Sequence, residues 1–156
     1  MIIAVVGGET SLPGEDQAAY EVGREIGRRG HTLVCGGRGG VMIEACRGTR
    51  EAGGHTIGIL PGDDRADMNP FVEFPILTGM GFARNAIIAR TADAVVAIGG
   101  RYGTLSEIAF AFIANRPVAA LGSWELTLPD GEAVPIVACD SAAEAVDYCE
   151  QFNQGV

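Results

Sequence analysis

The stretch from Asp93 to Glu107 constrains the fold of this chain more than any other. It begins with five apolar residues, 94–98, which are too few for a helix and rich in β-branched side chains, so they predict a buried strand. A glycine-rich turn, residues 99–104, follows, and apolar residues then recur at helical spacing. Free amides and the positive end of a helix dipole point at one spot in such an arrangement. We therefore predict that this turn holds a phosphate.

Strand-like and helix-like segments alternate along the whole chain. Strands are expected at 2–6, 32–35, 55–60, within 72–77, and at 94–98, 117–121 and 135–138. Helices are expected after a cap at Asp16, at 41–52 and 83–91, after the 99–104 turn as far as 115, and after a cap at Ser141, with a loop or hairpin at 122–134. The pattern predicts one domain, residues 1–156, with a Rossmann-like, doubly wound α/β fold: a mainly parallel sheet flanked by helices in three α/β/α layers.

Four of the expected strands end in glycine-containing turns. The turns lie at 7–8, 36–40, 61–62 and 99–103. Ligands of doubly wound sheets bind beyond the carboxyl ends of the strands, where the strand order reverses. Convergence of these turns on one edge predicts a nucleotide-sized ligand, although each could instead be a tight βα turn without one. The predicted phosphate or ligand contacts are Gly8, Gly36, Gly37, Arg38, Gly39, Gly40, Gly99, Gly100, Arg101, Gly103 and Thr104.

Charge and composition exclude several classes of function. The net charge of −9 and the pI near 4.6 oppose a broad nucleic-acid surface, since such a surface needs a basic face. All 11 basic residues are arginines, so neither a Walker-type lysine nor a Schiff-base lysine is available. The glycine cluster at 36–40 follows the second strand and no acidic residue is placed to bind a ribose, which disfavours NAD as a ligand.

Cysteine spacing and hydropathy favour a cytoplasmic protein. The four cysteines are far apart, without a Cys-x-x-Cys pair, and predict free thiols in a reducing compartment instead of a zinc site or a disulfide framework. No segment reaches the roughly 18 apolar residues of a membrane span, and the chain begins with an expected strand instead of a signal peptide. The two histidines are expected to be structural, and no metal site is predicted because Asp63, Asp64 and Asp67 lack the spacing of a calcium loop.

Arg84 and Glu107 are the candidate catalytic residues. Arg84 follows a loop, 78–81, that is expected at the same sheet edge; it could contact a substrate or be an ordinary arginine of a helix surface. Glu107 follows Thr104 by three residues. That spacing fits a capping box, with Thr104 as the N-cap, and it also fits a carboxylate that faces a ribose or acts as a general acid or base. Both alternatives remain open for each residue.

Several motifs resemble one known family. They are Gly36-Gly37-Arg38-Gly39-Gly40-Val41-Met42, Gly58-Ile59-Leu60-Pro61, Arg84-Asn85 and Gly103-Thr104-Leu105-Ser106-Glu107. With them the chain, from Ile2 to about Leu121, resembles the LOG-like (SLOG) superfamily, long labelled "possible lysine decarboxylase", which includes cytokinin-activating phosphoribohydrolases. The match is closer to a branch with Gly-Ile-Leu-Pro-Gly and Gly-Thr-Leu-Ser-Glu, to which the molybdenum cofactor carrier protein of algae is similar.

The resemblance implies a Rossmann-like fold, a homodimer or higher oligomer, and a nucleotide 5′-phosphate at the glycine turns. Arg84 and Glu107 match the arginine and glutamate that assist cleavage of a base from a nucleoside 5′-monophosphate in the phosphoribohydrolases. Lysine decarboxylation is excluded, because the Schiff base needs a lysine.

Three departures from the family pattern stand at the site. Ile98 replaces a proline, Asn85 replaces a lysine, and one extra residue separates Gly100 from Gly103. Two functions remain: a nucleoside 5′-monophosphate phosphoribohydrolase that requires no cofactor, or a carrier or sensor of a nucleotide, a phosphate compound or a molybdopterin-type cofactor without turnover.

Overall fold

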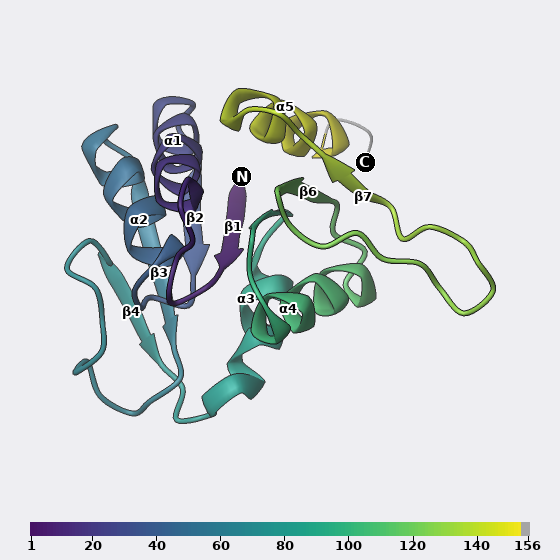
Figure 1. The fold of residues 1–156 in the computed structure, drawn as a ribbon. Coiled ribbons are helices and arrows are strands. Elements are labelled where there is room, and N and C mark those ends of the chain that lie inside the picture. The colour runs from purple at the N-terminus through teal and green to yellow at the C-terminus, as the bar shows by residue number, and fades with distance from the viewer. Residues whose placement is uncertain (154–156) are drawn as a thin grey trace.

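Seven strands form a single sheet in the computed structural model of this protein, which describes residues 1–153 (Figure 1). The strand order is β4-β3-β2-β1-β5-β6-β7, and every strand pair in this part of the chain is parallel. The strands are β1 (Ile2–Gly7), β2 (Thr32–Cys35), β3 (His55–Leu60), β4 (Phe74–Leu77), β5 (Ala94–Ile98), β6 (Val118–Leu121) and β7 (Ile136–Ala138). The helices are α1 (Glu15–Arg28), α2 (Val41–Glu51), the 3-10 helix η1 (Gly81–Arg84), α3 (Asn85–Thr91), α4 (Tyr102–Ile113) and α5 (Ala142–Asn153).

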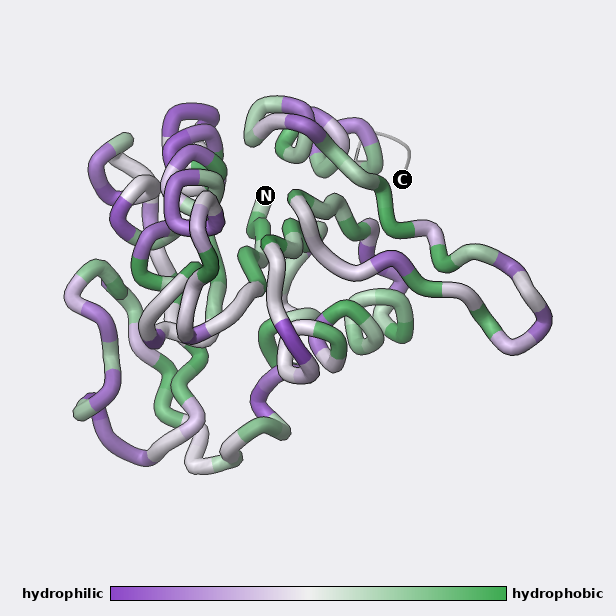
Figure 2. The backbone as a smooth tube through the Cα atoms, in the orientation of Figure 1, coloured by the Kyte–Doolittle hydropathy of each residue, from purple (hydrophilic) through white to green (hydrophobic). Residues whose placement is uncertain are grey.

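Helices cover both faces of the sheet. Helices α1, α2 and α5 pack on one face, whereas α3 and α4 pack together on the other (Figure 1). The central strands β1 and β5 are therefore buried from both sides, which explains their uninterrupted apolar runs. Figure 2 shows the central strands and α4 mostly hydrophobic and α1 mostly hydrophilic. The three-layer, Rossmann-like fold is confirmed.

The strand order reverses between β1 and β5. From β1 the chain adds β2, β3 and β4 on one side, and then returns to place β5 against the other side of β1. The last residue pair of this central ladder joins Gly7 to Ile98. The glycine turns at 7–8 and 99–103 therefore leave the sheet side by side, at the place where doubly wound sheets bind ligands.

Two of the three predicted helix caps are wrong. Helix α1 begins at Glu15, and its N-cap is Gly14 with a left-handed φ of 90° instead of Asp16. Helix α4 begins at Tyr102, so that Thr104 is already inside the helix and cannot form the proposed capping box. At α5 the prediction is confirmed, because the amide of Glu144 donates to Oγ of Ser141 at 3.2 Å.

The remaining sequence expectations concern residues outside the glycine turns. All four cysteines are free and buried, and the two histidines contact carboxylates, His31 that of Glu150 at 2.6 Å and His55 that of Glu73 at 2.8 Å. A bridge between Thr127 and Ala133 makes the 122–134 segment a hairpin. Within residues 1–153, none of the helices has both the length and the apolar character needed to span a membrane.

Candidate functional site

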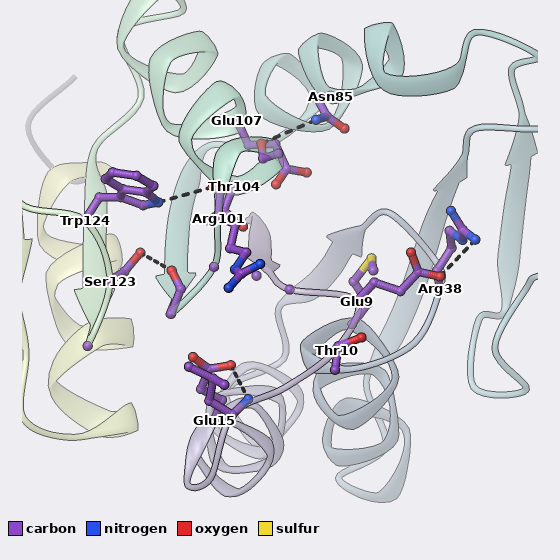
Figure 3. A pocket seen from close by; sticks show the side chains of 18 of the residues that line it. Glu9, Thr10, Glu15, Arg38, Asn85, Arg101, Thr104, Glu107, Ser123 and Trp124 are labelled. Carbon is purple, nitrogen blue, oxygen red and sulfur yellow. Dashed lines mark hydrogen bonds and ion pairs between the residues drawn. The ribbon is translucent and has the colours of Figure 1, made fainter.

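A cleft of about 900 Å³ opens at the carboxyl ends of β1 and β5 (Figure 3). Its walls come from the loop between β1 and α1, the turn between β5 and α4, and residues 122–125 after β6. The lining is completed by Phe82, Arg84, Asn85, Arg38 and Met42. The cleft thus lies at the topological switch point, the place expected from the order of strands.

The cleft brings together most of the residues that the sequence singled out. Those that line it are Gly8, Arg38, Arg84, Gly99, Gly100, Arg101, Gly103, Thr104 and Glu107. The glycines of the 36–40 turn do not line it, and neither does the 61–62 turn that ends β3. The structure therefore places the 7–8 and 99–103 turns at the cleft, whereas the 36–40 turn contributes only Arg38 and the 61–62 turn contributes nothing to its lining.

The glycines at 36–40 serve close packing. A Cβ atom on Gly40 would lie 2.2 Å from the carbonyl oxygen of Gly8, and one on Gly36 would lie 2.6 Å from Nη2 of Arg84. The amide of Val41, at the start of α2, donates to the carbonyl of Gly8 at 3.0 Å. This turn is occupied by the protein's own backbone, so its first helical amide is not free for a ligand.

The N-terminus of α4, in contrast, offers free donors. Gly99 and Gly100 have φ values of 50° and 91°, which only glycine adopts readily. The first backbone hydrogen bond of the helix is donated by Leu105 to the carbonyl of Arg101 at 2.9 Å. Within the described residues the amides at 102–104 have no backbone acceptor. Their N–H groups and the positive end of the helix dipole are therefore available to an anion, as the prediction for this turn requires.

Arg101 projects into the open cleft (Figure 3). Its side chain is exposed and forms no ion pair with any residue of 1–153. Arg38, on the opposite wall, is already paired with the carboxylate of Glu9 at 2.9 Å. Of these two arginines, Arg101 is the one whose charge is available to an anion without first breaking a salt bridge.

Arg84 lies deep at the base of the cleft, with only 7% of its surface exposed. Its Nη1 donates to Oδ1 of Asn85, and its Nη2 lies 3.5 Å from the carbonyl of Gly36. Its buried Nε has no partner among the described residues. Burial lowers the pKa of Arg84, while Glu107 opposes that shift. A buried guanidinium with an unused donor is costly, and an anionic ligand would offset that cost.

Glu107 is the only charged residue of α4 and is 6% exposed. Burial raises the pKa of its carboxyl group to about 8, and the nearby Arg84 acts in the opposite direction. The two side chains form no ion pair, and no hydrogen bond within residues 1–153 holds the carboxyl group. Burial thus favours the protonated form of Glu107 in the free protein, as is common for carboxyl groups of functional sites.

Asn85 lines the cleft. From the sequence it was named in a family motif and as a departure from the family pattern, without a role. Its Oδ1 accepts from Arg84, and its Nδ2 donates to Oγ of Ser106 at 2.9 Å and contacts the carbonyl of Gly103 at 3.4 Å. Asn85 therefore joins the buried arginine to the first turn of α4. Its position directly after Arg84 was the only signal of this role.

Four further lining residues were missed because nothing in their local sequence distinguishes them. Glu9 pairs with Arg38, and Glu15 accepts from the amide of Leu12 at 2.8 Å. Ser123 and Trp124 reach the cleft from the hairpin that follows β6. They are brought to the site by strand order, which a reading of adjacent residues does not show.

A comparison with known protein families covers the whole site. The model of the SLOG cluster4 family matches residues 1–152. The chain belongs to this family. An uncharacterised protein of Archaeoglobus fulgidus is 38% identical over 150 residues, which cover 96% of this chain and 94% of that protein. The cytokinin riboside 5′-monophosphate phosphoribohydrolase LOG of rice, Oryza sativa subsp. japonica, is 38% identical over 95 residues, 58% of this chain and 39% of the rice protein.

Solved structures of similar proteins share the fold over nearly the full length of this SLOG chain. The molybdenum cofactor binding protein of the phototrophic bacterium Rippkaea orientalis superposes with a TM-score of 0.89 at 34% identity, covering 97% of this chain and 96% of that one. The molybdenum cofactor carrier protein of Chlamydomonas reinhardtii gives a TM-score of 0.86 at 35% identity, covering 99% and 98%. The resemblance to the branch near the carrier proteins is thereby confirmed.

Proposed function

We propose that the cleft binds a phosphorylated, nucleotide-like small molecule. The observation that carries this proposal is the N-terminus of α4, where unpaired amides and the unpaired Arg101 face one open space. Backbone donors at a helix N-terminus bind phosphate oxygens, and an arginine adds charge and bidentate hydrogen bonds. The phosphate group would lie at the 99–104 turn, and the rest of the ligand would extend along the cleft.

The second part of the proposal concerns chemistry at Glu107. A ligand held by its phosphate would place its sugar near the carboxyl group of Glu107 and the guanidinium of Arg84. Protonated Glu107 can donate a proton to the leaving base as the bond between the base and C1′ breaks. The resulting carboxylate then lies beside a cation-like sugar and stabilises it. Water adds to C1′ and returns its proton to Glu107, which gives the free base and ribose 5-phosphate.

This reaction needs no cofactor, and its residues are Arg84 and Glu107. The similarity to the rice phosphoribohydrolase supports it, although the aligned segment spans only 39% of that enzyme. The arrangement also explains why Glu107 is buried without a partner: its carboxyl group is left ready to exchange a proton. We further propose a homo-oligomer, as the family resemblance implies, and a cytoplasmic location, in keeping with the free cysteines.

A second candidate is a carrier that holds a phosphorylated cofactor without turnover. Its support is the near full-length likeness to proteins named for molybdenum cofactor binding, at 34% and 35% identity. The same α4 terminus would hold the phosphate of a molybdopterin-type ligand. Asn85 favours this candidate, because it ties down the Arg84 guanidinium where the phosphoribohydrolases have a second positive charge.

Incubation with a panel of nucleoside 5′-monophosphates separates the candidates. Release of free base, followed by chromatography, supports the hydrolase, whereas a raised melting temperature without base release supports the carrier. Failure of every phosphorylated compound, ribose 5-phosphate included, to raise the melting temperature would contradict the binding proposal itself.

Glu107→Gln tests the catalytic role directly. The amide keeps the shape of the side chain but cannot donate the proton, so turnover is expected to fall at least about a hundredfold, while binding of ribose 5-phosphate remains. The two are measured by base release and by calorimetry on the same preparation. An equal loss of both would mean that Glu107 acts only in maintaining the helix.

A further inference from the structure

The end of β6 and the segment after it are tied to the 99–103 turn by three hydrogen bonds. The amide of Gly99 donates to the carbonyl of Leu121 at 3.2 Å. Oγ of Ser123 donates to the carbonyl of Gly99 at 2.6 Å, and Nε1 of Trp124 donates to the carbonyl of Arg101 at 3.2 Å. Two of these donors are side chains, and both dashed contacts are visible in Figure 3.

The 99–103 turn needs such support from outside because its glycines give its backbone unusual conformational freedom. Gly99 and Gly100 both have left-handed φ values and no side chain that restricts them. A Cβ atom on Gly100 would lie 2.2 Å from Oγ1 of Thr104, and one on Gly99 would lie 1.8 Å from Oε1 of Glu15. Bulkier residues are therefore not an alternative means of holding this turn rigid.

Trp124 forms its hydrogen bond with Arg101, in the part of the turn between Gly100 and Gly103 that has one residue more than the family pattern. Its indole donates to Arg101, and its ring lies near that of Tyr102, with the ring centroids 6.4 Å apart. The carbonyl of Arg101 also accepts the first hydrogen bond of α4 from Leu105. The indole N–H thus holds the residue that provides both the free arginine and the start of the helix.

We propose that Ser123 and Trp124 are positioning residues of the anion site: they hold the 99–101 backbone so that the α4 amides and Arg101 face one phosphate. This inference rests on the proposed binding of a phosphorylated ligand. Preorganised donors bind more tightly because less freedom is lost on binding. Neither side chain needs to touch the phosphate, since each acts through a carbonyl of the turn.

Trp124→Phe and Ser123→Ala each remove one of the two side-chain donors. Each variant is expected to bind ribose 5-phosphate roughly 3- to 10-fold more weakly, the usual effect of one lost hydrogen bond. Ser123→Thr keeps the hydroxyl group and should restore most of the affinity. Leu128→Ala, at an exposed position of the same hairpin with no bond to the turn, is the matched control and should bind as the wild type does.

Amide hydrogen exchange tests the positioning role without any ligand. In Trp124→Phe and Ser123→Ala, exchange at residues 99–104 should accelerate several-fold, while the central strands keep their protection. Unchanged exchange of the turn in both variants would overturn the inference. If the turn loosens but the wild type binds no phosphorylated compound, the proposed function fails and the positioning role stands.

The fluorescence of Trp124 gives an independent readout, because it is the only tryptophan of the chain. Ribose 5-phosphate does not absorb in the excitation range of tryptophan, so a change in emission on its binding would report a change around the indole. We expect a saturable change with the same affinity that calorimetry gives. Binding seen in calorimetry with no change in emission would contradict a link between Trp124 and the occupied turn.

Discussion

The two glycine-rich turns of this protein look alike in sequence and differ in use. The 36–40 turn is filled by its neighbours: Val41 donates its amide to Gly8, and Gly40 has no room for a Cβ atom. In the 99–103 turn, Cβ atoms on Gly99 and Gly100 would also clash, with the side chains of Glu15 and Thr104, but one on Gly103 would meet only Phe82, at 4.0 Å. The amides at 102–104 have no backbone acceptor within residues 1–153. Glycine content therefore identifies places where atoms approach closely. The two turns differ at the helix start, because the amide of Val41 is already bonded to Gly8, whereas the amides at 102–104 remain available to a ligand.

The largest expected difference between α4, which follows the 99–103 turn, and α2, which follows the 36–40 turn, is in the pH dependence of stability. The pKa of Glu107 is raised from 4.5 to about 8 in the folded protein, so the folded state binds the more protons between these values and stability falls as pH rises through this window. The difference in unfolding free energy between pH 4 and pH 9 that this carboxyl causes is about 3–5 kcal/mol.

Urea unfolding across this pH range provides the measurement. Glu107→Gln should lose the decline and gain stability relative to the wild type at pH 9. Glu44→Gln is the control on α2, because Glu44 forms an ion pair with Arg47 at the surface of that helix, and it should keep the wild-type slope. A wild-type slope in Glu107→Gln would show that another group causes the decline.

Alanine substitutions at Gly40 and Gly103 should change the free energy of unfolding by very different amounts. Gly40 has a φ of 58° and no space for a methyl group, so Gly40→Ala should reduce the free energy of unfolding by about 2–4 kcal/mol. Gly103 lies in the first turn of α4 with open space beside it, and Gly103→Ala should change stability by less than about 1 kcal/mol. Similar losses in both variants would contradict the difference in available space between positions 40 and 103.

Replacement of Arg101 or Arg38 should weaken the binding of ribose 5-phosphate to different extents. Arg101→Gln removes an unpaired charge and should weaken ribose 5-phosphate binding about tenfold, with little effect on stability. Arg38→Gln removes a charge that Glu9 already neutralises, and its effect on binding should be smaller. Calorimetry on both variants at one salt concentration decides, and a larger loss in Arg38→Gln would place the phosphate at the opposite wall.

The sequence predicted the fold well because it depends on local patterns. Apolar runs such as 94–98 and the regular spacing of glycine turns determined the strands, and the order of strands and helices determined the position of the cleft. The helix starts at 15 and 102 were mispredicted, since a glycine or an inserted residue can move a helix start by two or three residues without changing the apolar pattern of the helix. Whether the predicted site residues bind a ligand stays a prediction.

The roles of Ser123, Trp124 and Asn85 depend on contacts between distant segments. Trp124 reaches a carbonyl 23 residues earlier, and Asn85 bonds to Ser106 across two helices. No local motif announces such contacts. The different packing of the two glycine turns could not be predicted from the sequence for the same reason. The groups that pack against the 36–40 turn come from distant segments, the loop after β1 and Arg84.

The most direct test of the central claim is a titration of the ¹⁵N-labelled protein with ribose 5-phosphate, followed by amide chemical shifts. We predict large, saturable shifts for the amides at 102–104 and small ones for those at 36–41, whose first helical amide is already bonded to Gly8. Shifts centred on 36–41, or no saturable shift in either turn, would contradict the assignment of the phosphate site to α4.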